Sequence, residues 1–500
     1  MSGELADSPG GKARHLSLIL LLCCTAQFMV ILDVSIVNVA LPSIRSDLGF
    51  SVTGLQWVVN AYAIAFAGFL MLGGRAADLI GQRRTFFAGM LLFALASLAG
   101  GLAPGRGLLI GARAAQGLGG AIIAPASLSI ITTTFPEGAA RNRAVGLWGA
   151  MGGAGGAAGA LLGGIITQGL TWRWVLLINL PIGLLAAFAA TVLVGANPPR
   201  EEGRRPRSFD LTGALTVTGG LTVLAYGVVG TTTHGWASLP TLLTLALGFA
   251  LLGVFLLVES RFASAPLIPL RIFASGRLRA ANLVVLMLGA SAFAMWYFVS
   301  LYLQEVLRLT PLGAGLAFMP MALTVFACAG FAGQLTSRFG PGPVLGFGMT
   351  LIAAGMVLFA RIAVDGGYGS DVIAPGLLVS SGIGFSFVPA TIAAVTGVPP
   401  HEAGLASGLV NTSRQMGGAL GLAILASLAS QHSDHLISND YLAPVAALTD
   451  GFHRAFIVGA GFATVGAAIA FALLPGIHSR RGVPGADAGG ESAVALAPVE

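Results

Sequence analysis

The sequence predicts an all-α polytopic membrane protein, and two observations indicate this fold class. Of the 500 residues, 55% are hydrophobic and 9% are charged, whereas a soluble domain carries roughly 25% charged residues. Apolar blocks of about 20 residues, the length that crosses a bilayer, recur along the whole chain. Since backbone groups cannot stay unpaired in lipid, these blocks must form helices. The composition excludes soluble enzymes, nucleic-acid-binding proteins and disordered scaffolds.

Fourteen membrane-spanning helices are expected. Their ranges are 16–41, 54–73, 86–104, 106–131, 144–166, 173–194, 211–230, 240–258, 282–304, 312–333, 343–360, 372–394, 405–428 and 454–474. An even number of crossings puts both termini on one side. Eighteen Arg and Lys residues fall in the tails and loops of that side, and six fall in the opposite loops. This excess predicts a multi-pass protein of the cytoplasmic membrane with both termini in the cytoplasm.

Two polar, Arg-containing stretches divide the chain after the sixth and the eighth expected helices. We therefore expect two six-helix bundles and two additional helices that are central in the sequence. The expected parts are a cytoplasmic tail over 1–15, a bundle over 16–196, loops and the two helices over 197–281, a bundle over 282–476, and a disordered cytoplasmic tail over 477–500.

The connection after the second expected helix reads Gly74-Arg-Ala-Ala-Asp78-Leu-Ile-Gly81-Gln-Arg83-Arg84. Glycines permit a tight turn and a close approach of two helices, and the mixed charges can hold neighbouring helix ends together. We interpret these five named residues as gating contacts rather than substrate ligands. The pattern and its place resemble the loop signature of the major facilitator superfamily.

Further motifs resemble one branch of that superfamily. They are Leu32-Asp33-Val-Ser-Ile-Val-Asn38-Val-Ala-Leu41-Pro42, Arg113-Ala-Ala-Gln116-Gly117, Trp172-Arg173-Trp174, Tyr302-Leu-Gln304, and Gly404-Leu-Ala-Ser-Gly408-Leu-Val-Asn411-Thr-Ser-Arg414-Gln415. Together they are similar to those of the fourteen-spanner drug:proton antiporters, a family of multidrug exporters. The resemblance implies the major facilitator fold. It also implies secondary active export of drug-like or antibiotic molecules in exchange for protons.

The fifth expected helix departs from the family pattern. Such exporters usually carry a Gly-Pro before paired glycines, whereas this chain has Ala160 in the place of the proline. Proton-coupled uptake of a metabolite therefore stays open as an alternative. Glycines at four-residue spacings still predict close helix packing, at Gly155, Gly159, Gly163 and Gly164.

Three formal charges lie well inside apolar blocks: Asp33, Arg113 and Arg414. Each costs roughly 2.5–3.5 kcal/mol at a helix centre, so each needs a partner or a function. Equal depth in their helices predicts an Asp33–Arg113 pair, with Gln116 beside it. We hypothesise that Asp33 carries the proton and Arg113 tunes it; the alternative is a pair that only joins two helices. Arg414 is expected to be structural, cross-linking the second bundle through backbone carbonyls.

The candidate substrate cavity comprises Asn38, Gln116, Trp296, Tyr297 and Phe298. Amide and aromatic side chains suit an amphipathic small molecule, although helix packing is the alternative for each. Without a second deep carboxylate, neutral or singly cationic compounds are expected as substrates.

No catalytic group, cofactor site or metal site is predicted. The spacing of His432 and His435 is interpreted as part of a solvated outer loop, and a membrane-embedded enzyme is the remotest alternative. There is no ATPase signature, so an ion gradient or a partner chain must supply the energy. The expected partners are the substrate, protons and the bilayer, and the chain is expected to act as a monomer.

Overall fold

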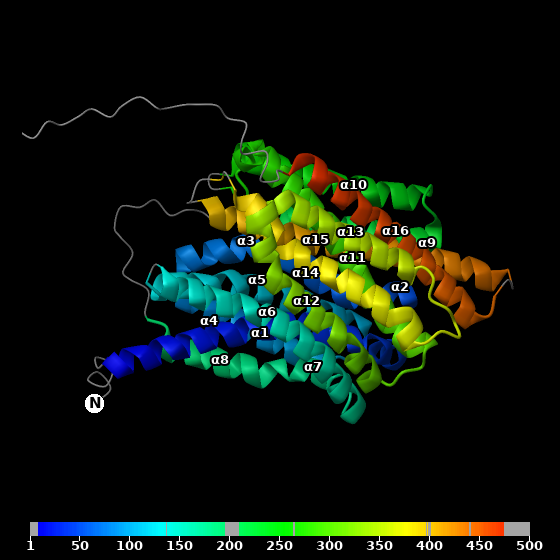
Figure 1. Cartoon of the computed structure of the whole chain (residues 1–500), viewed down its shortest axis with the longest axis horizontal. Helices are drawn as coiled ribbons and strands as arrows, with labels where there is room; N and C mark the ends of the chain where they lie inside the picture. The colour runs from blue at the N-terminus through cyan, green and yellow to red at the C-terminus, as the bar shows by residue number, and fades with distance from the viewer. Residues whose placement is uncertain are drawn as a thin grey trace, which may run out of the picture.

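The computed structural model describes residues 9–136, 138–195, 210–263, 266–396, 398, 402–439 and 442–474. These residues form helices joined by short connections, with no strand among them. The helices lie side by side along the long axis of the molecule (Figure 1). The all-α fold class is therefore confirmed. The predicted tail over 477–500 lies outside the described residues. Of the predicted tail over 1–15, residues 1–8 lie outside them, and α1 begins at Pro9.

The helices follow the predicted order. The first half comprises α1 (Pro9–Leu48), α2 (Val52–Leu55), α3 (Trp57–Ile80), α4 (Gln82–Gly101), α5 (Arg106–Thr134), α6 (Ala139–Gly169), α7 (Trp174–Leu177) and α8 (Asn179–Leu193). Next come α9 (Leu211–His234), α10 (Leu239–Leu257), η1 (Val258–Phe262) and η2 (Leu270–Ala274). The second half comprises α11 (Gly276–Leu301), η3 (Tyr302–Val306), α12 (Pro311–Phe339), α13 (Pro341–Phe359), η4 (Tyr368–Val372), α14 (Ile373–Val395), α15 (Ala403–Ser438) and α16 (Pro444–Leu473).

Among the described residues, 13 helical segments are long and apolar enough to cross a membrane. The remaining predicted crossing is α15, which is more polar and extends over 36 residues. It packs against α3, α9, α11 and α16, and several of its polar side chains, such as Thr412, Gln415 and Ser427, are buried. Because α15 continues to Ser438, His432 and His435 lie in a helix rather than in the predicted loop.

The predicted bounds mark the apolar part of each helix and miss its polar ends. The first helix was expected over 16–41, but α1 runs from Pro9 to Leu48 and contains Pro42. A proline lacks an N–H, yet a helix can continue through it when the freed carbonyl finds another donor.

The two halves pack mainly within themselves and meet along a shared boundary. In the first half α1 packs on α6, and α5 packs on α3 and α4. In the second half α11 packs on α15, and α13 packs on α14 and α16. Contacts of α6 with α12, and of α3 with α15, join the halves. The additional pair lies at the edge, because α10 packs on α9 and η1, and only α9 reaches α3 and α15.

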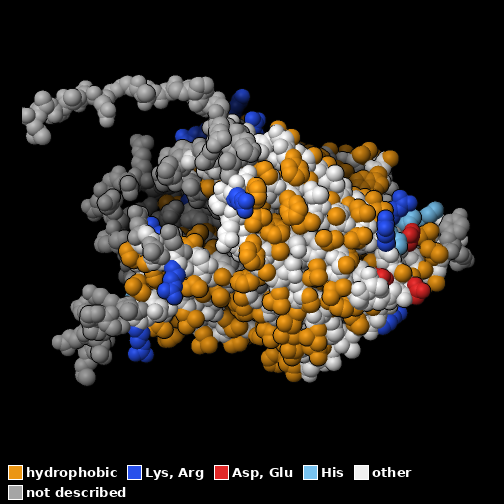
Figure 2. All heavy atoms as spheres, viewed as in Figure 1, with side chains coloured by type: hydrophobic (Ala, Val, Ile, Leu, Met, Phe, Trp, Pro, Cys, Tyr) orange, Lys and Arg blue, Asp and Glu red, His pale blue; other side chains and the backbone are white. Residues whose placement is uncertain are grey.

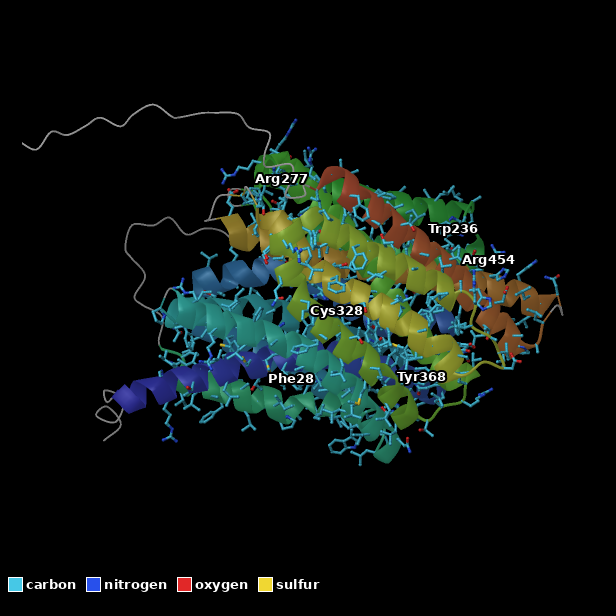
Figure 3. All side chains as sticks on the ribbon, viewed as in Figure 1. Phe28, Trp236, Arg277, Cys328, Tyr368 and Arg454 are labelled. Atoms are coloured by element: carbon cyan, nitrogen blue, oxygen red, sulfur yellow. The ribbon has the colours of Figure 1, made fainter. Side chains whose placement is uncertain are left out.

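Hydrophobic side chains cover the middle of the visible surface, and charged side chains gather at its two ends (Figure 2). Arg277 lies at the end of the molecule near the start of α1, and Arg454 lies at the opposite end (Figure 3). This pattern fits a multi-pass membrane protein with an apolar belt in contact with lipid tails. We call the end at Leu48 of α1 the distal end.

Candidate functional site

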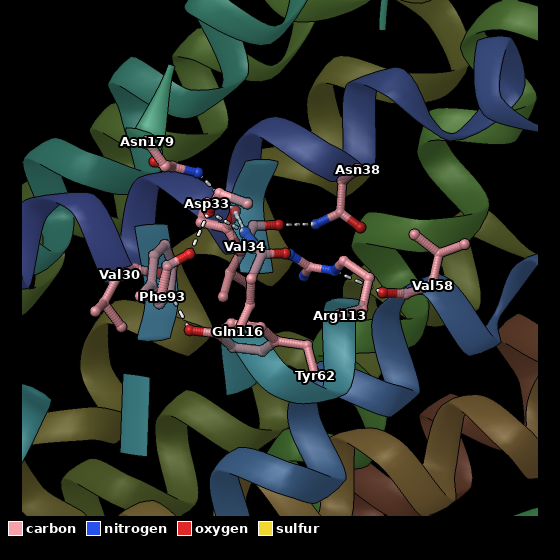
Figure 4. A network of polar contacts seen from close by, with 11 residues as sticks. Val30, Asp33, Val34, Asn38, Val58, Tyr62, Phe93, Arg113, Gln116 and Asn179 are labelled. Atoms are coloured by element: carbon pink, nitrogen blue, oxygen red, sulfur yellow. Dashed lines mark hydrogen bonds and ion pairs between the residues drawn. The ribbon is translucent and has the colours of Figure 1, made fainter. Parts of the chain in front are cut away.

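A buried carboxylate lies at the centre of the first half (Figure 4). Asp33 of α1 is fully buried. Its Oδ2 accepts a hydrogen bond from Nη1 of Arg113 at 2.5 Å. Its Oδ1 accepts one from Nδ2 of Asn179 at 2.9 Å and one from Nε2 of Gln116 at 3.0 Å. Three donors from two other helices, α5 and α8, therefore surround this carboxylate.

The guanidinium of Arg113 is held equally firmly. Its Nε donates to the carbonyl of Val58 at 2.9 Å, and its Nη1 also donates to Oε1 of Gln116 at 2.9 Å. The ring of Tyr62 lies 4.6 Å from the guanidinium carbon. Gln116 donates in turn to the hydroxyl of Ser97 at 2.7 Å. We call this set the polar network; it ties α1, α3, α4, α5 and α8 together.

The ion pair at the centre of this network is almost completely buried. Breaking a buried ion pair leaves an uncompensated charge, which costs several kcal/mol. If Asp33 gained a proton, Arg113 would lose its counter-ion and the donors would lose part of their acceptor.

The structure brings the predicted Asp33, Arg113 and Gln116 together. Sequence reasoning did not assign Asn179, Ser97 or Tyr62 to this network. For Asn179 a signal existed, because an amide inside an apolar block needs a buried partner.

A cavity of about 190 Å³ lies between the two halves. Its walls are Ile31, Val34, Ser35, Asn38 and Val59 with Gly152 and Gly156 from the first half, and Leu288, Gly289, Ala292, Phe293, Trp296, Ala322, Val325, Ile383, Phe387 and Arg414 from the second. Most of these side chains are apolar or aromatic. Both halves thus contribute to one amphipathic pocket, as a small-molecule site requires.

The predicted cavity residues Asn38 and Trp296 line this pocket, whereas Gln116, Tyr297 and Phe298 do not. Gln116 belongs to the polar network. Tyr297 and Phe298 are fully buried and do not reach the cavity wall. Successive residues of a helix point about 100° apart, so three consecutive aromatic residues cannot all face one pocket. The assignment of these two residues is corrected accordingly.

Arg414 also lies on the cavity wall, which corrects its predicted role as a cross-link to backbone carbonyls. Its Nη2 donates to Oδ1 of Asn411 at 2.7 Å, one turn back on α15. Its guanidinium carbon lies 4.8 Å from the centre of the Phe387 ring. The prediction assumed that a buried arginine must bond to the neighbouring backbone, but an aromatic face and an amide satisfy part of its needs instead.

Hydrogen bonds between the halves close the distal end of the molecule. Arg45 of α1 forms an ion pair with Glu305 of η3. The hydroxyl of Tyr297 donates to the carbonyl of Val52 at 2.9 Å, and Nε2 of Gln304 donates to the carbonyl of Val39 at 2.9 Å. These three contacts join the two halves at this end.

The sequence matches one family model. The model described as Major Facilitator Superfamily matches residues 23–422. The chain belongs to the major facilitator superfamily. Members of this superfamily are transporters, so the chain is a transporter rather than an enzyme.

Two curated relatives of this superfamily member are similar over most of their length. The cephamycin export protein CmcT of Amycolatopsis lactamdurans is 43% identical over 81% of this chain and 83% of its own. The puromycin resistance protein pur8 of Streptomyces alboniger is 38% identical over 95% and 93%. A solved bacterial homologue of the human lysosomal transporter Spinster, in an inward-facing conformation, has a TM-score of 0.65 and 16% identity over 91% of this chain and 96% of its own. This last likeness shows the fold alone.

The loop signature of the superfamily forms a very tight turn here. Gly81 separates α3 from α4 with a φ of 98°, a conformation that favours glycine. A Cβ on Gly74 would lie 3.6 Å from Pro125, whereas the neighbouring Gly73 lies directly against the backbone of α5. Arg83 and Arg84 form no ion pair with any described residue, and the side chain of Asp78 lies outside the described part. The contact to α5 is made by Gln82, which bonds to Ser129 at 2.8 Å.

The glycines of α6 lie against two different helices. A Cβ on Gly155, Gly159 or Gly163 would lie within 3.0 Å of atoms of α1, and one on Gly164 would lie 2.6 Å from the carbonyl of Pro311 in α12. The first three let α6 approach α1 closely. Gly164 lets the two halves approach each other near the distal end. No group of three or more His, Cys, Asp or Glu residues that could hold a metal occurs in the described part of the chain.

Proposed function

We propose that the chain exports a drug-like or antibiotic small molecule across the cytoplasmic membrane in exchange for protons. The observation that carries this proposal is the position of α1. Val34 and Asn38 of this helix line the cavity, while Asp33 faces the polar network. A change of charge on Asp33 would therefore move one wall of the substrate cavity.

We propose a transport cycle on this basis. In the conformation described, Asp33 bonds to groups of α5 and α8 while contacts between the halves close the distal end. Both termini are proposed to be cytoplasmic, as the distribution of Arg and Lys favours, so this conformation would load its substrate from the cytoplasm. Opening of the distal end would then release the substrate and allow Asp33 to take up a proton from outside. The return to the first conformation would release that proton inside.

The names of the relatives support export rather than uptake. Besides the two proteins above, a tetracenomycin C resistance and export protein of Streptomyces glaucescens is 35% identical over 86% of this chain and 80% of its own length. We propose the same direction for this chain, with an amphipathic substrate and a monomer as the working unit, because the cavity lies within one chain.

The test uses inside-out membrane vesicles of a host that lacks its own multidrug exporters. An imposed proton gradient, acidic inside, should drive accumulation of tetracenomycin C or the dye N-phenyl-1-naphthylamine, and an uncoupler should abolish it. Asp33→Asn should remove this accumulation at equal protein level. Accumulation in right-side-out vesicles instead would contradict export and favour uptake. Full proton-driven export by Asp33→Asn would contradict the role of Asp33.

A further inference from the structure

The wall of the cavity carries one formal charge. Among its described residues, Arg414 alone is ionised, and Ser35 and Asn38 are the neutral polar side chains. The hydroxyl of Ser35 donates to the carbonyl of Gly156 at 2.7 Å, and Nδ2 of Asn38 donates to the carbonyl of Val34 at 3.0 Å. No carboxylate lines the pocket. The electrostatic character of the cavity is therefore set by a single cation.

This cation lacks the partners that buried arginines normally have. Within the described part of the chain, Arg414 forms no ion pair, and its buried Nε has no hydrogen-bond acceptor. Its hydrogen bond goes to the neutral amide of Asn411. Arg113 provides the contrast, because it bonds to a carboxylate, an amide and a backbone carbonyl. One buried arginine is compensated and the other is not.

An uncompensated charge in a membrane interior is unfavourable, and such charges commonly mark a substrate or ion pathway. An anion that entered the cavity would gain charge-assisted hydrogen bonds from Arg414, about twice as strong as neutral ones. A cation would instead meet a like charge in a medium of low dielectric constant. The faces of Phe293, Trp296 and Phe387 would cover the rest of the molecule.

We infer that the substrate of this transporter is an aromatic or polycyclic organic anion whose carboxylate or equivalent acidic group binds Arg414. The inference rests on the proposed function and names its substrate class. It replaces the neutral or singly cationic compounds expected from the sequence. That expectation rested on the lack of a second deep carboxylate, and it treated Arg414 as a structural residue outside the cavity.

A matched pair of dyes tests the inference. The probes are 8-anilino-1-naphthalenesulfonate, an anion, and N-phenyl-1-naphthylamine, which has the same rings without the sulfonate. Binding is measured by equilibrium dialysis on the full chain in lipid nanodiscs, with empty nanodiscs subtracted. We expect the anion to bind more tightly than the neutral dye.

Asn411→Asp is the decisive variant, because it places a carboxylate beside Arg414 without a change in volume. We expect it to weaken binding of the anionic dye roughly tenfold to a hundredfold and to leave the neutral dye within about twofold. Asn411→Ala, which removes the amide without adding a charge, should retain anion binding. Arg414→Lys should retain most of it, and Arg414→Met should lose it.

Three results would overturn the inference. If Asn411→Asp and Arg414→Met bind the anionic dye like the wild type, Arg414 does not select the substrate. If each variant weakens binding of both dyes equally, the role of Arg414 is structural. In both cases proton-driven export of the neutral dye by the wild type would leave the proposed function intact. If the wild type neither binds nor transports either dye, both proposals fail together.

Discussion

The hydroxyl of Ser300 donates a hydrogen bond to the carbonyl oxygen of Asn38 at 2.6 Å, across the boundary between the two halves. In a regular helix this carbonyl would accept from the N–H four residues later. That residue is Pro42, which has no N–H. The proline therefore frees an acceptor on α1, and the second half supplies its donor.

The first prediction concerns this contact. Ser300→Ala should destabilise the closed distal end, because the carbonyl of Asn38 would lose its donor. A hydrogen bond is worth about 0.5–1.5 kcal/mol, so the ratio of closed to open molecules should fall roughly two- to tenfold. Distances between spin labels on the distal ends of α1 and α11 would report this ratio.

Ser291→Ala is the matched control for that experiment. Ser291 lies on the same helix and bonds to the carbonyl of Gly459 at 3.0 Å, but that bond stays within the second half. Loss of this hydrogen bond should lower the stability of the protein but leave the spin-label distances between α1 and α11 unchanged. An equal shift in both variants would refute the assignment of Ser300 to the closed end.

The second prediction concerns Arg45 and Glu305 at the distal end. Their side chains are 31% and 20% exposed, so the pair is partly solvated and should contribute about 0.2–1 kcal/mol. Glu305→Gln should open the distal end modestly, and the effect should shrink at high salt because ions screen exposed charges. The exchanged pair Arg45→Glu with Glu305→Arg should restore closure. Spin-label distances at low and high salt measure both effects, and a failure of the exchanged pair to recover would count against the ion pair.

The third prediction concerns Asn179. Asn179→Ala should remove one donor to the carboxylate of Asp33, a loss of about 1.5–3 kcal/mol for a bond to a charged group. The melting temperature of the purified protein should fall, and so should proton-driven export. Asn282→Ala is the control: this buried amide bonds to the carbonyl of Leu278 and to Ser413 in the second half. Asn282→Ala should lower the melting temperature, but the number of protons exchanged per substrate molecule should stay unchanged.

The fourth prediction concerns the packing of α6 on α1. A Cβ on Gly159 would lie 2.6 Å from Cβ of Ser35 and 2.9 Å from the carbonyl of Leu32. Gly159→Ala should therefore cost about 1–3 kcal/mol, as overpacking does, and reduce the yield of folded protein. Gly149→Ala on the same helix meets no atom within 4 Å and should be neutral or stabilising. Thermal unfolding in one detergent compares them, and equal melting temperatures would contradict the contact.

The sequence predicts those features that depend on the length of an apolar block and on the depth of a residue along its helix. Apolar blocks fixed the number and order of the crossing helices. The equal depth of Asp33 and Arg113 predicted that they could meet. Depth can be counted along the chain, because each residue of a helix adds a constant rise.

Features that depend on the rotation of a helix about its axis could not be predicted in the same way. A helix that is apolar on all sides gives no pattern that marks its inner face. Trp296 therefore could not be distinguished from Tyr297 as the cavity residue, and Arg414 could not be assigned to the cavity. The same limit explains why Asn179 was not recognised as a partner of Asp33.

The two faces of α1 have a pharmacological consequence. An inhibitor wedged between Val34 and the aromatic wall would immobilise the helix that also bears Asp33. Under the proposed mechanism it would block the exchange of protons as well as export of the substrate.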